Sequence, residues 1–131
     1  MSKKVLVVDR EEVIRKLLRI HLAKLGYEVE EAADGAEALE QLGNEYFDFL
    51  ILDILIPNED GWQILKEVKS NPKTKDIPVI VLTAKNEDSD MFKGYELGAS
   101  YYLTKPFTKA QLLCGLQLIF EEKGESLSMA G

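Results

Sequence analysis

Hydrophobic and polar positions divide the chain into short segments of two kinds. Three runs are almost wholly apolar, and turn or polar residues bound each of them: KVLVVD at 4–9, FDFLILD at 47–53 and IPVIVLTA at 77–84. Runs of this length and composition predict strands that are buried on both faces. Two more strands are predicted where the pattern is more polar, at 27–32 and at 100–104.

Between these strands, apolar positions recur at helical spacing. The first such stripe is formed by Ile14, Leu17, His21 and Leu25, and it stops at Gly26, a residue typical of helix ends. Further helices are predicted at 36–42, at 62–70, near 88–97, and in the last segment, where Leu112, Leu113, Leu116, Ile119 and Phe120 line one face. Five strand–helix units in alternation favour an α/β fold, a doubly wound, five-stranded parallel sheet covered on both faces.

Composition narrows the class of protein. The 131 residues are 46% hydrophobic and 30% charged, which fits one globular domain, expected here over 1–122, with 123–131 as a C-terminal tail or linker stub. A net charge of −7 disfavours a nucleic-acid surface. No signal-like start or membrane-length apolar run is present, and Cys114 is the only cysteine. We expect a cytoplasmic protein that binds neither nucleic acid nor membrane directly.

Charged and hydroxyl side chains lie where the predicted strands end. Asp9 and Arg10 follow the first strand, while Asp53, Thr83 and Lys105 lie at the ends of later ones. Open parallel sheets bind ligands at this edge, near the switch in strand order. Clustered carboxylates there suit a hard cation such as Mg²⁺, and a carboxylate beside a lysine suits nucleophilic attack on phosphorus.

The chain resembles the receiver domain of two-component response regulators from about Lys4 to Glu122. Four stretches carry the resemblance in order: VLVVD–EEVIRKLL, FDFLILDILIPNEDGWQIL, IPVIVLTA and GASYYLTKPF. The resemblance implies a flavodoxin-like sheet with strand order 2-1-3-4-5. It also implies a signalling switch rather than an enzyme, since a receiver catalyses only its own phosphorylation.

The resemblance assigns roles to five positions. Asp53 matches the phosphoacceptor, and Lys105, which precedes a proline that is cis in the family, matches the lysine that pairs with the phosphate. Thr83 matches the switch hydroxyl, and Tyr102 matches the aromatic residue whose rotamer follows the switch. Asp9 matches the first member of an acidic pair.

The resemblance also implies a cofactor and partners. Mg²⁺ would be held by Asp9, Asp53 and the backbone carbonyl of Leu55. The phosphoryl group would come from a histidine kinase or a phosphotransfer protein. The phosphorylated surface would then act on a downstream target protein or output domain.

Arg10 departs from this pattern because it stands where the family keeps a second acid that ligates Mg²⁺. With Arg10 in the site, two carboxylates would face two cations, and repulsion would weaken Mg²⁺ binding. Three alternatives stay open. Arg10 turns to solvent and Glu11 or Glu12 supplies the missing carboxylate; Arg10 replaces the metal; or the domain is an atypical receiver with weak or no Mg²⁺-dependent phosphorylation, acting as a protein-interaction module.

Overall fold

The computed structural model describes residues 3–56, 60–84 and 93–122. Within them, the strands are β1 (Lys4–Val8), β2 (Glu28–Ala32), β3 (Phe49–Asp53), β4 (Val79–Thr83) and β5 (Tyr101–Thr104). The helices include α1 (Glu12–Lys24), α2 (Gly35–Asn44), α3 (Gly61–Ser70) and α5 (Lys109–Glu122). Residues 93–96 are also helical, whereas the first part of the helix predicted near 88–97 and the predicted tail at 123–131 lie outside the described residues.

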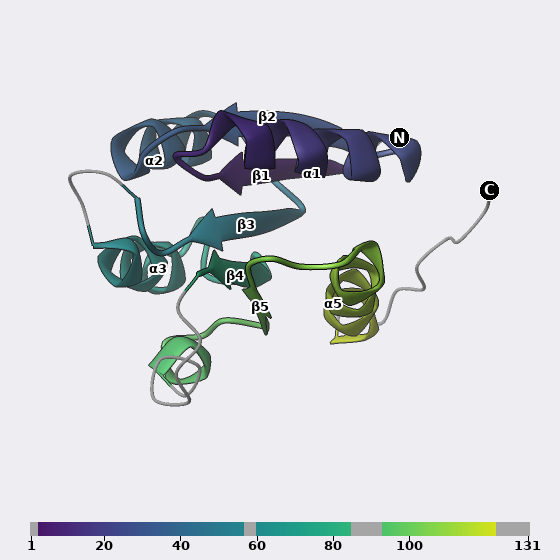
Figure 1. Ribbon diagram of the computed structural model, residues 1–131. Coiled ribbons are helices and arrows are strands. Elements are labelled where there is room, and N and C mark those ends of the chain that lie inside the picture. The colour runs from purple at the N-terminus through teal and green to yellow at the C-terminus, as the bar shows by residue number, and fades with distance from the viewer. Residues whose placement is uncertain (1–2, 57–59, 85–92, 123–131) are drawn as a thin grey trace.

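The strands form one parallel sheet in the order β2-β1-β3-β4-β5, as Figure 1 shows from β2 at the top to β5 below. The predicted fold class and strand order are therefore confirmed. The order reverses at β1, which lies between β2 and β3. Ligands of open parallel sheets bind at such a switch point, beyond the carboxyl ends of the strands.

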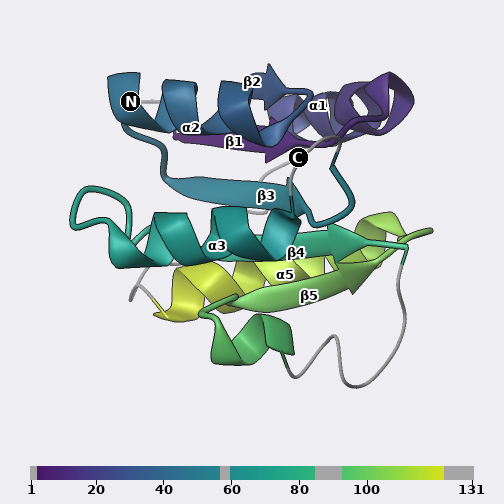
Figure 2. The same cartoon turned by 90° about the vertical axis from the view of Figure 1, so that its left-hand side faces the viewer.

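Successive residues of each strand point to opposite faces, so the sheet separates two apolar clusters. Leu50 and Leu52 of β3 pack with α2 and α3, while Phe49 and Ile51 pack with α1 and α5. Figure 2 shows this layering, with α3 in front of the sheet and α5 behind it. Within the described residues, no helix is long and apolar enough to cross a membrane.

Side chains at the helix ends explain where the helices start and stop. Asp34 caps α2 by accepting a hydrogen bond from the Glu37 amide, 2.9 Å away. Asp60 does the same for α3, accepting from the Trp62 amide at 3.0 Å. After α1, Gly26 adopts a φ of +91°, a conformation that glycine tolerates and that ends the helix as its position in the sequence predicts.

The structure differs from the sequence-based prediction in several element bounds and in the buried face of α1. Phe47 and Ile77 are buried but precede the β3 and β4 ladders, because an apolar side chain can be buried from a loop as well as from a strand. Leu17 is 39% exposed, and α1 instead buries Leu18 and Leu22. Both sets have helical spacing, so the pattern alone could not tell which one faces the sheet.

Candidate functional site

The carboxyl edge of the sheet brings Asp9, Asp53 and Lys105 together, as their positions at the strand ends predicted. The Lys105 Nζ atom lies 2.8 Å from Asp9 Oδ2 and 3.0 Å from Asp53 Oδ2. It also lies 3.2 Å from Glu11 Oε1. One ammonium therefore faces three carboxylates, and both aspartates are buried.

The local backbone fixes the orientation of both aspartates in the same way. Asp9 Oδ1 accepts a hydrogen bond from the Glu11 amide at 2.8 Å, and Asp53 Oδ1 accepts one from the Leu55 amide at 2.8 Å. Aspartate commonly bonds to the backbone two residues ahead in this manner. In each aspartate, Oδ1 therefore accepts a hydrogen bond from the loop backbone, and Oδ2 points toward Lys105.

Lys105 is held at this edge by its own backbone. Its amide donates a hydrogen bond to the Thr83 carbonyl at 2.8 Å, and the peptide bond that follows it, to Pro106, is cis. Thr83 is fully buried at the end of β4, so the predicted switch hydroxyl lies on the strand next to Asp53. Tyr102, also buried, packs in the cluster beneath α2 and α3.

The charges of the site perturb one another. Burial raises the pKa of Asp9, and the nearby Asp53 carboxylate raises it further, outweighing the contacts with Lys105 and the Glu11 amide. Burial alone would lower the pKa of Lys105, but its contacts with Asp9 and Asp53 reverse the direction and raise it. Lys105 therefore stays an ammonium ion, and the site carries more negative charge than this one cation neutralises.

Arg10 does not join this cluster. Its side chain is exposed, and it forms no ion pair with any residue in 3–56, 60–84 or 93–122. The neighbouring acid Glu11 contacts Lys105 instead, while Glu12 pairs with Lys16 at 3.0 Å along the outside of α1. The exposed Arg10 agrees with the first of the three alternatives, and Glu11 rather than Glu12 is the acid at the site, while a role of Glu11 as a metal ligand stays a prediction.

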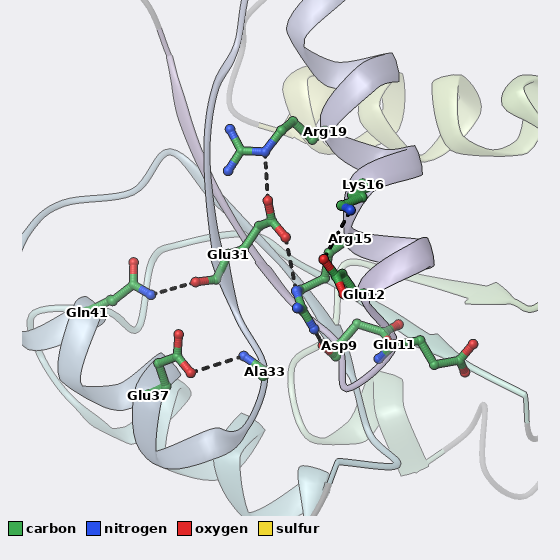
Figure 3. A network of polar contacts seen from close by, with 10 residues as sticks. All are labelled: Asp9, Glu11, Glu12, Arg15, Lys16, Arg19, Glu31, Ala33, Glu37 and Gln41. Atoms are coloured by element: carbon green, nitrogen blue, oxygen red, sulfur yellow. Dashed lines mark hydrogen bonds and ion pairs between the residues drawn. The ribbon is translucent and has the colours of Figure 1, made fainter.

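A second polar network, drawn in Figure 3, holds the backbone of Asp9 in place. Arg15 Nη1 donates to the Asp9 carbonyl at 2.7 Å, and Arg15 Nε donates to Glu31 Oε1 at 3.0 Å. Arg19 Nε reaches the other oxygen of Glu31 at 2.7 Å. Burial would raise the pKa of Glu31, but Arg19 and Arg15 together lower it. The sequence analysis did not predict this network. Its only signal in the sequence is the spacing of Arg15 and Arg19, four residues apart in one helix, followed by the acidic strand EVEEA.

As the side chains stand in the described ranges, no group of three or more His, Cys, Asp or Glu is placed to hold a metal ion. At this edge the Lys105 ammonium lies among the carboxylates of Asp9, Asp53 and Glu11. Asp9 Oδ2 is buried and, despite its ion pair with Lys105, has no hydrogen bond of acceptable geometry. Asp53 and Glu11 each direct one more carboxylate oxygen to the same place. Oxygen donors of this kind are what Mg²⁺ prefers, so the chemistry of these side chains fits the ion, which would have to displace the ammonium from them.

Comparison with known proteins identifies the family. The sequence matches the response regulator receiver domain over residues 5–117. It is 42% identical over 112 residues to the alkaline phosphatase synthesis transcriptional regulatory protein PhoP of Bacillus subtilis. That similarity covers 86% of this chain and 46% of PhoP, so the chain spans about half the length of this relative.

Solved structures agree in fold. Chemotaxis response regulator CheY4 of Vibrio cholerae superposes with a TM-score of 0.85 at 36% identity, covering 91% of this chain and 99% of CheY4. A CheY-like receiver domain protein of Methanospirillum hungatei superposes with a TM-score of 0.84 at 28% identity, covering 95% and 99%. With sequence and fold in agreement over most of its length, this chain belongs to the response regulator receiver domain family of two-component signalling.

Proposed function

We propose that this chain is a phosphorylation-activated signalling switch whose phosphoacceptor is Asp53. The observation that carries the proposal is the contact of 3.0 Å between Asp53 Oδ2 and Lys105 Nζ at the carboxyl edge of the sheet. An aspartate in that position has a nucleophilic oxygen beside a fixed positive charge. Phosphoryl transfer needs this combination of positioning and charge neutralisation.

The transfer is a single displacement at phosphorus. A carboxylate oxygen of Asp53 attacks the phosphoryl group of a phosphohistidine on a histidine kinase or phosphotransfer protein. The new bond joins that oxygen to phosphorus, the P–N bond breaks, and its electron pair leaves with the imidazole. Lys105 faces the negative charge on the phosphoryl oxygens, and the Leu55 amide keeps the carboxylate oriented through Oδ1.

Magnesium fits into the same proposal. Asp9, Asp53 and the backbone carbonyl of Leu55 would hold the ion, which supplies positive charge to the phosphoryl oxygens when bound. Asp9 supports this role because its Oδ2 is buried and directed into the site. The loop backbone contributes by bracing both aspartates through Glu11 and Leu55.

The aspartyl phosphate would change the surface of the protein. It replaces the single charge of the carboxylate with the nearly two negative charges and three acceptor oxygens of the phosphoryl group. Thr83, one strand away from Asp53, would turn its hydroxyl to these oxygens, and Tyr102 on the adjoining strand would repack. The surface around β5 and α5 would then shift in population and bind a target protein or output domain.

The proposal extends to the setting of the protein. The receiver unit would span 1–122 and work in the cytoplasm, with phosphoryl acceptance as its only chemistry. The exposed Arg10, in place of a second acid, favours one rival function. In that rival, the chain is a protein-interaction module with weak or no Mg²⁺-dependent phosphorylation.

Phosphorylation by acetyl phosphate or phosphoramidate, followed by intact mass with and without Mg²⁺, tests the proposal. We expect one added phosphoryl group on the natural chain and none on Asp53→Asn. An adduct that persists in Asp53→Asn would contradict the assignment of the acceptor. No adduct on the natural chain, together with one on Arg10→Asp, would favour the interaction module.

A further inference from the structure

Glu11 occupies an unusual place between the site and the first helix. It is the residue before α1, and its backbone is extended, with φ −87° and ψ +112°. Its side chain makes no capping hydrogen bond to that helix, although this is the position where a side chain ordinarily does so. The carboxylate instead lies 3.2 Å from Lys105 Nζ, on a residue 94 positions away in the chain.

The contact changes the charge balance of the site. Asp9, Asp53 and Glu11 place three carboxylates around the Lys105 ammonium, for a formal charge of −2. Arg10 is exposed and is not part of this group. Glu11 therefore restores the negative charge that an acid at position 10 would have supplied.

The buried oxygen of Asp9 is a second observation that favours a ligand at this cluster. Asp9 is fully buried, and its Oδ1 is occupied by the Glu11 amide. Its Oδ2 has no hydrogen bond, although Lys105 Nζ is close. A buried carboxylate oxygen in this condition costs free energy that a hard cation would recover.

We propose that Glu11 supplies the carboxylate missing at Arg10, so that Asp9, Asp53 and Glu11 together bind a divalent cation of the Mg²⁺ class. The inference rests on the proposed function, since it concerns the cation that serves Asp53. It also gives Arg10 a defined place, outside the cluster and in solvent. Binding of the cation then competes with Lys105 for the oxygens that the ammonium holds.

Glu12 provides a matched control one residue away. It has the same charge as Glu11 and lies at the same end of α1, but it pairs with Lys16 and its side chain is 66% exposed. Conversion of either glutamate to glutamine changes the net charge equally. A general electrostatic effect would therefore appear in both variants, and a ligand effect would appear only in Glu11→Gln.

The test is a calorimetric titration of the full chain with MgCl₂ alone, in the absence of any phosphodonor. We expect Glu11→Gln to weaken Mg²⁺ by about tenfold or more, as loss of a group that supports a metal site commonly does. Glu12→Gln should change the affinity by less than about twofold, since exposed charges interact weakly across solvent. Arg10→Asp should bind Mg²⁺ more tightly and respond less to the added Glu11→Gln substitution.

Two results would overturn the inference. The first is equal weakening by Glu11→Gln and Glu12→Gln, and the second is no measurable binding of Mg²⁺ by the natural chain. Neither decides whether Asp53 accepts a phosphoryl group, which the mass measurement reports separately. Circular dichroism of each variant verifies that the fold is retained before titration.

Discussion

Gly61 begins α3 so close to the preceding loop that it has no room for a side chain. A Cβ atom there would clash with the Cα and the carbonyl oxygen of Ile54, both of which are backbone atoms. We expect Gly61→Ala to lower the free energy of unfolding by about 1–3 kcal/mol, as overpacking does, because Ile54 closely follows Asp53 and cannot move freely. Urea denaturation measures the change.

Gly43 offers the opposite case within the same protein. A Cβ atom at this position in α2 would meet nothing within 4 Å. Gly43→Ala should therefore raise the free energy of unfolding, by up to about 1 kcal/mol, because alanine loses less backbone entropy in a helix. If both alanine variants were equally destabilised, contact with Ile54 would not explain the requirement for Gly61.

The buried carboxylate of Asp9 is expected to lower the stability of the fold at neutral pH. Its pKa is raised above its ordinary value of 3.8, so ionised Asp9 destabilises the folded state at neutral pH. We expect Asp9→Asn to unfold at a higher temperature at pH 7, because asparagine can still accept the Glu11 amide and Lys105 keeps its other two partners. The gain should vanish as the pH falls through the native pKa of Asp9 toward 3.8. A lower melting temperature at pH 7 would mean that the ion pair with Lys105 outweighs burial.

At the scale of elements, Arg15 links α1 to β1 and β2. Its side chain is 15% exposed and contacts both the Asp9 carbonyl and Glu31. We expect Arg15→Met to lower the free energy of unfolding by about 1–2 kcal/mol, since it removes charge-assisted hydrogen bonds from a mostly buried site. Arg19→Met should change it by about 0.5 kcal/mol or less, because Arg19 is 46% exposed. Chemical denaturation of both variants tests the difference.

The ion pair between Arg15 and Glu31 predicts that the free energy of unfolding depends on pH. The pKa of Glu31 is lowered below its ordinary value of 4.5, so its ionised form stabilises the fold above that value. This contribution should be lost as the pH falls through the lower native pKa. The cost of Arg15→Met should therefore shrink in acid, and a cost that is equal at pH 7 and in strong acid would place the effect in packing rather than in the pair with Glu31.

Local pattern was enough to predict the elements but not their limits. The three apolar runs became β1, β3 and β4, because short uninterrupted apolar runs are typical of strands covered on both faces. Phe47 shows the weakness of that signal, since it is buried without joining a ladder. In α1, the choice between Leu17 and Leu18 depended on how the helix rests against the sheet, which is tertiary information.

At the scale of the whole molecule, some features of the site could be predicted from the sequence and others could not. Asp9, Asp53 and Lys105 were predicted to meet because the topology gathers the carboxyl ends of parallel strands at one edge. Their contacts are found, while their chemical roles stay predictions. The sequence left Glu11 and Glu12 as alternatives, since the contact of Glu11 with Lys105 depends on the extended backbone before α1 and on the turn after β5.

The two apolar clusters should unfold as one unit because they share every strand. Leu116 of α5 is fully buried on one face of the sheet, and the single tryptophan, Trp62 of α3, is buried on the other. We expect Leu116→Ala to lower the free energy of unfolding by about 2–5 kcal/mol, the usual cost of such a cavity. Trp62 fluorescence should report the same decrease as far-UV circular dichroism, although the substitution lies across the sheet.

Leu118 is the matched control for that experiment. It lies two residues further along α5 and is 43% exposed, so Leu118→Ala should change the free energy of unfolding by about 0.5 kcal/mol or less. If Leu116→Ala shifted the circular dichroism transition but left the Trp62 transition in place, the two faces would unfold separately. A single transition would instead tie α5 to α3 through the sheet, because neither cluster can lose its strands without exposing the other. The proposed switch at Asp53 would need such coupling for its effect to reach a distant helix.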